Sequence, residues 1–142
     1  MIVIDTNVIS EVMRPQPNAS VLTWLNQQSS FDLFVTSVSI AEIGYGLRVL
    51  ADGQRRRLLR SRFEQFIAQG FERRILNFDW DAAQAYADIM GYRKEMGCPM
   101  SFPDAQIAAI TRVQHFKLAT RNIKDFNDCG VDLIDPFDCH IA

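Results

Sequence analysis

Short β-rich runs alternate along this chain with longer segments of helical periodicity, and this alternation constrains the fold more than any other feature. The first run is Ile2–Ile4, and further runs of strand composition lie at residues 31–39, 73–78, 117–120 and 131–134. Strands that alternate with helices form largely parallel sheets with helices on both faces. We therefore expect an α/β protein, a three-layer α/β/α sandwich with a mainly parallel sheet.

The segments between these runs carry apolar residues three or four positions apart, which is the period of a helix. Helices are predicted within residues 21–25, 40–50, 54–71, 82–96 and 104–116. Asp79 or Asp81 is the expected N-cap of the fourth of these helices. Asn7 can cap a further short helix that begins at Val8.

Composition is that of an ordered globular protein, with 48% hydrophobic and 23% charged residues. The length of 142 residues fits one domain over residues 1–142. Asp5 interrupts the apolar start before a signal sequence could form, and no apolar run approaches the roughly 18–20 residues of a membrane span. We therefore expect a cytoplasmic protein without a membrane partner. The net charge of -2 gives no support to nucleic-acid binding, which must rest on local charge.

Cysteine and histidine are sparse and lack the spacing of a zinc site. Cys98, Cys129 and Cys139 are an odd number of cysteines, which fits a reducing compartment. Cys139 and His140 are adjacent, but no second Cys/His pair stands at zinc-finger spacing. We interpret the cysteines as small apolar residues and His115 as a packed or surface side chain.

Acidic residues stand at the boundaries of the expected elements. Asp5 ends the first strand, Glu42 lies in the first turn of the helix after the second run, and the segment 122–125 follows the run at 117–120. In a right-handed parallel arrangement, strand ends and the starts of the following helices share one edge of the sheet. These groups are therefore expected to face one crevice. Asp104 begins a helix that precedes a strand, so the alternation alone does not place it there.

Each acid also has a purely structural interpretation. The pairs Ser39–Glu42 and Ser101–Asp104 match the capping pattern in which an acid reaches back to the N-cap amide. If the acids instead converge, carboxylates about 5 Å apart repel by roughly 3 kcal/mol at an effective dielectric near 20. All-oxygen ligands favour Mg²⁺ or Mn²⁺, and such an ion supports phosphodiester hydrolysis by activated water. Both interpretations stay open at this point.

Four segments together resemble a known family. The sequences MIVIDTNVISE, VSIAEIGYGL, SFPDAQIAA and LATRNIKDF occur in the order and at about the spacing of PIN-domain ribonucleases, above all the VapC-type and FitB-type toxins of bacterial toxin–antitoxin pairs. The resemblance covers essentially the whole chain. It implies a PIN-like sandwich with an acidic, Mg²⁺- or Mn²⁺-binding pocket that cleaves RNA and leaves a 5′-phosphate and a 3′-hydroxyl.

The resemblance also implies roles for individual residues. By position, Asp5, Glu42 and Asp104 correspond to the principal acids, which bind metal and orient the attacking water. The fourth acidic position falls to Asp125 or to Asn122, and the choice is open because an amide cannot act as a base at neutral pH. Side chains expected to support these acids are Thr6, Asn7 and Thr120.

Partners are implied in the same way: an RNA substrate, a cognate antitoxin that blocks the active site, and a homodimer or a higher toxin–antitoxin assembly. Arg121, beside the expected pocket, is a candidate for RNA contact, whereas the arginines of segment 55–62 are better interpreted as a solvated helix face. Trp24 and Tyr45 could belong to an apolar surface that receives a partner.

Two other functions compete with the ribonuclease. The first is a phosphatase with Asp5 as nucleophile, although Asn7 stands where phosphatases of the haloacid-dehalogenase type have a second Asp. The second is a non-catalytic interaction module in which the acids only cap helices. Trapping of a phospho-aspartate tests the first, and insensitivity of RNA binding to chelation tests the second.

Overall fold

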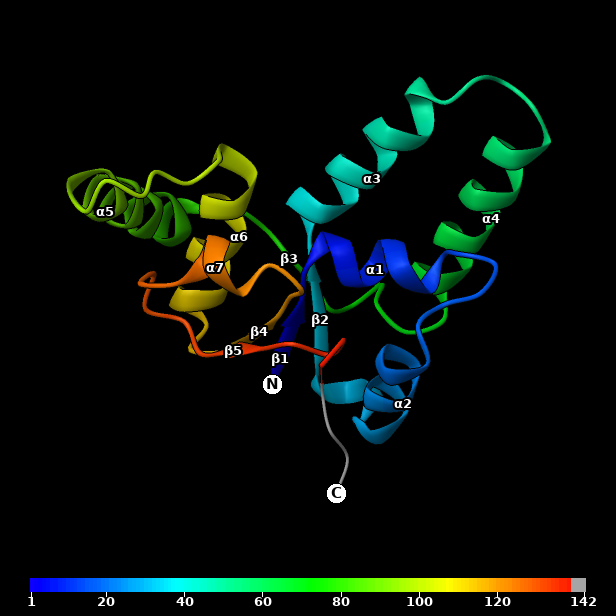
Figure 1. Ribbon diagram of the computed structural model, residues 1–142, viewed down its shortest axis with the longest axis horizontal. Helices are drawn as coiled ribbons and strands as arrows, with labels where there is room; N and C mark the ends of the chain where they lie inside the picture. Colours follow the sequence, from blue (N-terminus) through cyan, green and yellow to red (C-terminus); the bar gives the residue numbers. More distant parts are fainter. Residues whose placement is uncertain (139–142) are drawn as a thin grey trace.

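The computed structural model describes residues 1–138, which form a sheet between two layers of helices (Figure 1). The strand order is β3-β2-β1-β4-β5, and every neighbouring pair is parallel. The strands are β1 (Ile2–Ile4), β2 (Leu33–Thr36), β3 (Ile75–Leu76), β4 (Lys117–Ala119) and β5 (Leu133–Ile134). The expected α/β/α sandwich is confirmed, and the pairings are all parallel.

The helices run back between these strands. They are α1 (Thr6–Val12), α2 (Ala19–Gln27), α3 (Ser37–Val49), α4 (Gln54–Ala68), α5 (Trp80–Glu95), α6 (Phe102–Val113) and α7 (Ile123–Phe126), with a short 3-10 turn η1 (Ser30–Asp32) before β2. None of them is long and apolar enough to cross a membrane, within the part of the chain that the structure describes.

Alternating side chains of the strands build a core on each face of the sheet. Ile4 and Val35 pack with helices α1 to α4, whereas Val3 and Leu118 pack with α5, α6 and α7. The two groups of helices lie on opposite sides of the sheet in Figure 1. Because strand side chains alternate, these short strands are buried on both faces, and they leave polar residues only at their ends.

The second strand is shorter than the sequence predicts, and α3 starts earlier. The strand expected over residues 31–39 ends at Thr36, and the helix expected from Ile40 begins at Ser37. The cause is a cap: the Thr36 hydroxyl accepts a hydrogen bond of 3.1 Å from the Ser39 amide. Ser39 thus lies inside the helix, and the predicted capping pair Ser39–Glu42 is wrong.

Other helix ends differ in similar ways. Helix α1 begins at Thr6 and is capped by Asp5, so the predicted cap at Asn7 is wrong. The expected cap at Asp79 is confirmed, with a bond of 2.9 Å from the Ala82 amide. Helix α6 ends at Val113 rather than 116, because the chain turns through a left-handed residue at φ 59 two positions later.

The free thiols of the described residues are those of exposed Cys98 and buried Cys129. Cys139 and His140, which the zinc argument also concerned, lie outside the described residues.

Candidate active site

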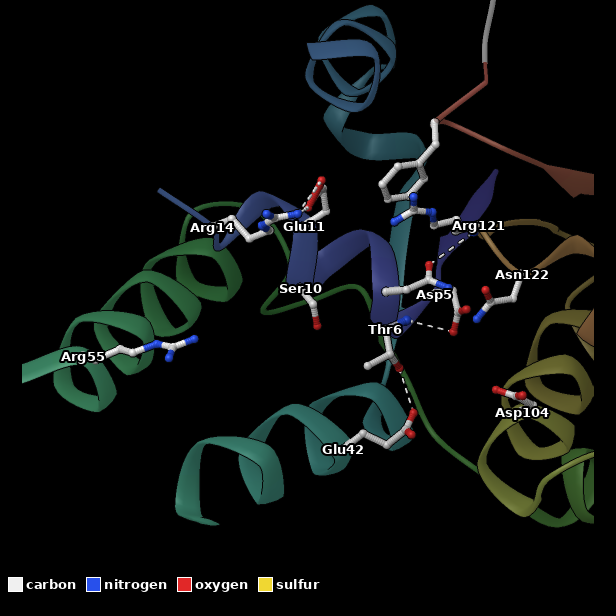
Figure 2. A pocket seen from close by; sticks show the side chains of 12 residues that line it. Asp5, Thr6, Ser10, Glu11, Arg14, Glu42, Arg55, Asp104, Arg121 and Asn122 are labelled. Carbon is white, nitrogen blue, oxygen red and sulfur yellow. Dashed lines mark hydrogen bonds and ion pairs between the residues drawn. The ribbon is translucent and has the colours of Figure 1, made fainter. Parts of the chain in front are cut away.

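A pocket of about 580 Å³ opens beside the carboxyl ends of β1 and β4 (Figure 2). It brings together most of the residues that the sequence predicts for the site, namely Asp5, Thr6, Asn7, Glu42, Asp104, Arg121 and Asn122. Figure 2 shows Asp5, Glu42 and Asp104 around one space, each supplied by a different part of the chain. The crevice predicted at this edge of the sheet is therefore present, and it includes Asp104.

Asp5 is the buried acid of the pocket, with 3% of its surface exposed. One carboxylate oxygen accepts a bond of 2.8 Å from the Thr6 amide, and the other accepts one of 2.8 Å from the Thr120 hydroxyl. Burial raises the pKa of Asp5 from 3.8 to about 6, although both hydrogen bonds act in the opposite direction. The charges of Asp104 and Glu42 raise this pKa further. Asp5 thus caps α1 and also faces the other acids.

Glu42 reaches the pocket from the second turn of α3. Because α3 begins at Ser37, Glu42 lies beyond the first turn and is not bound to an N-terminal amide of its own helix in any described contact. The Thr6 hydroxyl donates to a Glu42 carboxylate oxygen at 2.8 Å and also lies 2.8 Å from the Ser39 hydroxyl. Glu42 is therefore oriented from α1, across the pocket.

Asp104 lies in the first turn of α6 and is half-buried. Ser101 caps this helix, and its hydroxyl accepts a bond of 3.4 Å from the Asp104 amide. Burial raises the pKa of Asp104, and the charges of Asp125 and Glu42 raise it further against the lowering effect of Ser101. The predicted capping position at Ser101 is confirmed, and Asp104 still faces the pocket.

The loop after β4 supports the site through hydrogen bonds. Thr120 is fully buried, and its hydroxyl also accepts from the Asn122 amide at 3.1 Å. The Asn7 side chain donates to the same hydroxyl at 3.4 Å and accepts from the Arg121 amide at 3.3 Å. Asn7 therefore joins the start of α1 to this loop. Asn122 precedes α7 without a side-chain capping bond, and it lines the pocket.

Asp125 is exposed on α7 and does not line the pocket, although its charge acts on Asp104. The position of α7 is fixed by Arg93, which is 6% exposed. Its guanidinium donates to the backbone carbonyls of Cys98, Asp125 and Asn127 at 2.7, 3.1 and 2.5 Å. Of the two candidates for the fourth position, Asn122 is the one that faces the pocket.

The carboxylates of Asp5, Glu42 and Asp104 carry negative charge that no ion pair with a described side chain neutralises. Among residues 1–138, the ion pairs join Arg14 to Glu11 at 3.2 Å and Arg57 to Asp52 at 3.7 Å, so none involves Asp5, Glu42 or Asp104.

The described residues also contain no group of three or more His, Cys, Asp or Glu close enough to hold a metal ion as they stand. Mutual repulsion favours such separation. Mg²⁺ keeps several of its waters and binds proteins through one or two carboxylates, so an all-oxygen donor set of this kind fits it.

The sequence did not indicate several residues that line the pocket: Ser10, Glu11, Arg14, Arg55 and Phe137. Ser10 and Glu11 lie one helical turn after Thr6 and Asn7. A helix predicted to start at Thr6 would therefore have indicated them. Arg55 begins α4, so the interpretation of segment 55–62 as a solvated face does not hold for this residue. Phe137 lies far along the chain, and no sequence pattern connects it to the site.

A family model described as PIN domain matches residues 2–131. VapC ribonuclease Y4jK of Sinorhizobium fredii is 36% identical over 138 residues, covering 97% of this chain and 99% of the relative. Toxin FitB of Neisseria gonorrhoeae is 37% identical over 137 residues, covering 96% and 99%. A solved structure of FitAB bound to a DNA fragment matches with a TM-score of 0.91 at 36% identity, over 99% of both chains.

Proposed function

This chain belongs to the PIN-domain family, and on that premise we propose that it is the endoribonuclease toxin of a type II toxin–antitoxin pair. It would act as a single PIN-like domain on RNA in the cytoplasm, as a homodimer or in a larger toxin–antitoxin assembly. The observation that carries the proposal is the convergence of Asp5, Glu42 and Asp104 in one pocket without a neutralising ion pair among the described residues.

We assign Mg²⁺ or Mn²⁺ binding to Asp5, Glu42 and Asp104. When bound, such an ion supplies the positive charge that acidifies water and offsets the charge of a phosphate. Asp5 is ionised above a pKa of about 6 and is held by two hydrogen bonds, so it presents a fixed negative charge at neutral pH. Glu42 and Asp104 flank it and orient the attacking water for hydrolysis of the phosphodiester bond.

Neighbouring residues hold these acids in place. Thr120 fixes one oxygen of Asp5, and Thr6 holds Glu42, both at 2.8 Å. We propose that Asn122, which faces the pocket, contacts the substrate or water at the fourth position. Asp125 acts on the site through its charge, which favours the protonated form of Asp104.

Two arginines are suited to the RNA backbone. Arg121 and Arg55 line the pocket from opposite sides, one after β4 and one at the start of α4. Neither is in an ion pair with a described carboxylate. Phosphates need such positive charge beside an acidic centre that would otherwise repel them.

A second, more apolar groove adjoins the pocket, and we propose it as the binding site of the antitoxin. Its volume is about 590 Å³, and it lies between α1, α3 and α4, where Met13, Leu47 and Leu58 contribute apolar surface. It shares Glu42 and Arg55 with the acidic pocket, so a peptide in this groove would also cover the entrance to the acids. Tyr45 is exposed but does not line the groove, and the partner surface expected at Trp24 is wrong because that side chain is 5% exposed.

An RNA-cleavage assay with purified protein and Mn²⁺ tests the proposal. The wild type should cut single-stranded RNA, EDTA should stop the reaction, and Asp5→Asn should lose activity while keeping its circular dichroism spectrum. Asp81→Asn, which changes an exposed acid of α5 that does not line the pocket, should cut at the wild-type rate. Activity of Asp5→Asn within a few-fold of the wild type would contradict the assignment.

A further inference from the structure

An aromatic ring and a guanidinium group lie together at the edge of the acidic pocket. The guanidinium carbon of Arg121 is 4.6 Å from the ring centroid of Phe137, and both residues line the pocket. Figure 2 shows Arg121 beside Asp5 and Asn122. Four carboxylates line this pocket, but no ion pair joins any of them to Arg121 within residues 1–138. The guanidinium is thus held by the ring rather than by an acid.

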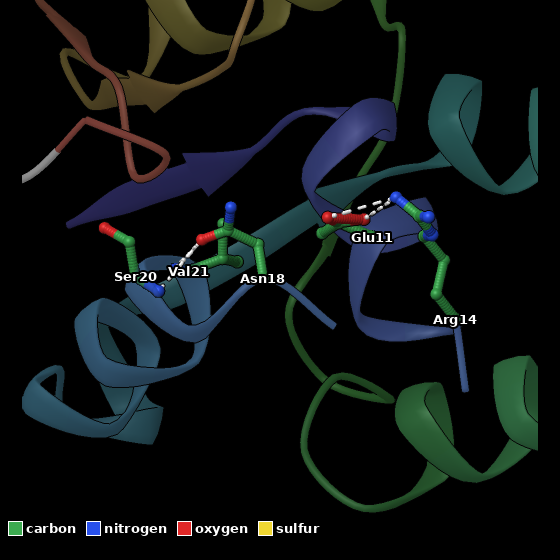
Figure 3. Close-up of polar contacts among 5 residues, drawn as sticks. All are labelled: Glu11, Arg14, Asn18, Ser20 and Val21. Carbon is green, nitrogen blue, oxygen red and sulfur yellow. Dashed lines mark hydrogen bonds and ion pairs between the residues drawn. The ribbon is translucent and has the colours of Figure 1, made fainter. Parts of the chain in front are cut away.

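The peptide that joins Pro136 to Phe137 is held at both its amide and its carbonyl. The Phe137 amide donates to the Asp135 side chain at 2.9 Å, and the carbonyl of buried Pro136 accepts from the Ser20 hydroxyl at 3.0 Å. Ser20 is fixed in turn, because the Asn18 side chain caps α2 by accepting from its amide at 2.9 Å (Figure 3). The ring also packs against the core formed with α1 to α4. Its position is therefore set before any ligand binds.

Arg121 is anchored through its backbone, and its side chain is exposed. Its amide donates to the Asn7 side chain at 3.3 Å. Arg14, which lines the same pocket, differs because its guanidinium is already engaged by Glu11 at 3.2 Å, as Figure 3 shows. A fixed, exposed guanidinium over a fixed ring needs little ordering when a flat ligand stacks on it.

We propose that Phe137 and Arg121 form a stacking platform for one nucleobase of single-stranded RNA next to the bond that is cut. This inference rests on the proposed ribonuclease function. Unstacked bases of RNA bind to aromatic rings and to guanidinium planes. A base is neutral, so it can approach the acids of the pocket where a second phosphate would be repelled. A contact to phosphate alone would need the charge of Arg121 but not the ring of Phe137.

The test uses an oligoribonucleotide that the wild type cuts at one bond, and copies with a single abasic ribonucleotide at each position around that bond. Binding is measured by fluorescence anisotropy in the inactive Asp5→Asn background of the full chain. Phe137→Leu should weaken binding of the intact oligonucleotide about 10-fold. The same substitution should have no effect on the copy that lacks the stacked base. Phe137→Trp should restore binding, because it keeps an aromatic face.

Phe31→Leu is the matched control. Phe31 also lies under an arginine, 5.7 Å from the guanidinium carbon of Arg74, but it does not line the pocket. The Phe31→Leu variant in the Asp5→Asn background should bind every oligonucleotide with the same affinity as Asp5→Asn alone.

Equal weakening by Phe137→Leu on intact and abasic RNA, or no weakening at all, would overturn the platform while cleavage by the wild type still supports the ribonuclease. The platform would also be overturned if Phe137→Leu weakened only inhibition by the antitoxin and left RNA binding unchanged, because the ring would then contact the protein partner. Absence of both cleavage and RNA binding in the wild type would overturn the proposed function and the platform together.

Discussion

At the scale of single residues, the carboxylate of Asp5 has two functions. It caps α1 through the Thr6 amide, and it remains next to two other acids inside a pocket. Capping and hydrogen bonding favour its ionised form, but burial outweighs both and raises its pKa to about 6. The ionised form of Asp5 is therefore unfavourable in this pocket, and a bound cation would stabilise it.

This raised pKa predicts how stability depends on pH. The folded protein holds the Asp5 proton up to about pH 6, whereas the unfolded chain releases it near 3.8, so stability falls as pH rises through that interval. At about 1.4 kcal/mol per pH unit between the two values, ionisation of Asp5 destabilises the fold by on the order of 3 kcal/mol. Asp5→Asn removes this dependence.

Urea unfolding at about pH 4.5 and about pH 7.5, without divalent metal, measures the effect. The free energy of unfolding of Asp5→Asn, relative to that of the wild type, should be higher at about pH 7.5 than at about pH 4.5. The same comparison for Asp81→Asn should give no such change. If Asp5→Asn and the wild type differ in free energy of unfolding by the same amount at both pH values, burial does not raise the pKa of Asp5.

At the scale of elements, the start of α3 decides where Glu42 points. Thr36 is fully buried at the end of β2, and its hydroxyl accepts from the Ser39 amide. Thr36→Ala removes this cap and should lower the free energy of unfolding by about 1–2 kcal/mol. Thr36→Ser keeps the hydroxyl and should retain most of that stability in urea unfolding. Equal losses for the two variants would mean that the lost methyl group, not the cap, is what matters.

Some of the strands and helices could be predicted from the sequence, and some of their ends could not. The strand at Ile2–Ile4 and the helix of segment 54–71 were predictable, because apolar spacing alone defines them. The switch from strand to helix at Thr36 was not, since the β-branched residues Thr36 and Val38 are typical of strands and continue that composition past the boundary. Only the hydrogen bond of the cap ends the strand there.

The residues of the candidate site likewise include some that could be predicted from the sequence and some that could not. Acids at strand ends were predictable because parallel strands share an edge, and Asp5 and Glu42 do meet there. Asp104 was placed by family resemblance, since alternation says nothing about the start of a helix that precedes a strand. Phe137 was not predicted, because its approach to Arg121 depends on how the chain turns after β5.

At the scale of the whole molecule, an acidic pocket and an apolar groove share one face and several lining residues. Leu58 lies in the groove only and is 48% exposed. Leu58→Glu should weaken binding of the cognate antitoxin about 10-fold or more, since it replaces apolar contact with a buried charge. RNA cleavage by the free protein should be unchanged.

Calorimetric titration of the antitoxin into each variant measures this loss. Leu22→Glu is the matched control, because Leu22 is 38% exposed on α2 and lies outside the groove. Equal antitoxin affinity of Leu58→Glu and Leu22→Glu would place the antitoxin elsewhere.

Titration calorimetry of Mn²⁺ into the metal-free protein is the most direct test of the central claim, that acids remote in sequence act as one cation site. Binding of Mn²⁺ should be saturable in the wild type and in Asp81→Asn, lost in Asp5→Asn and Asp104→Asn, and weaker in Glu42→Gln. Wild-type affinity in both Asp5→Asn and Asp104→Asn would contradict that claim.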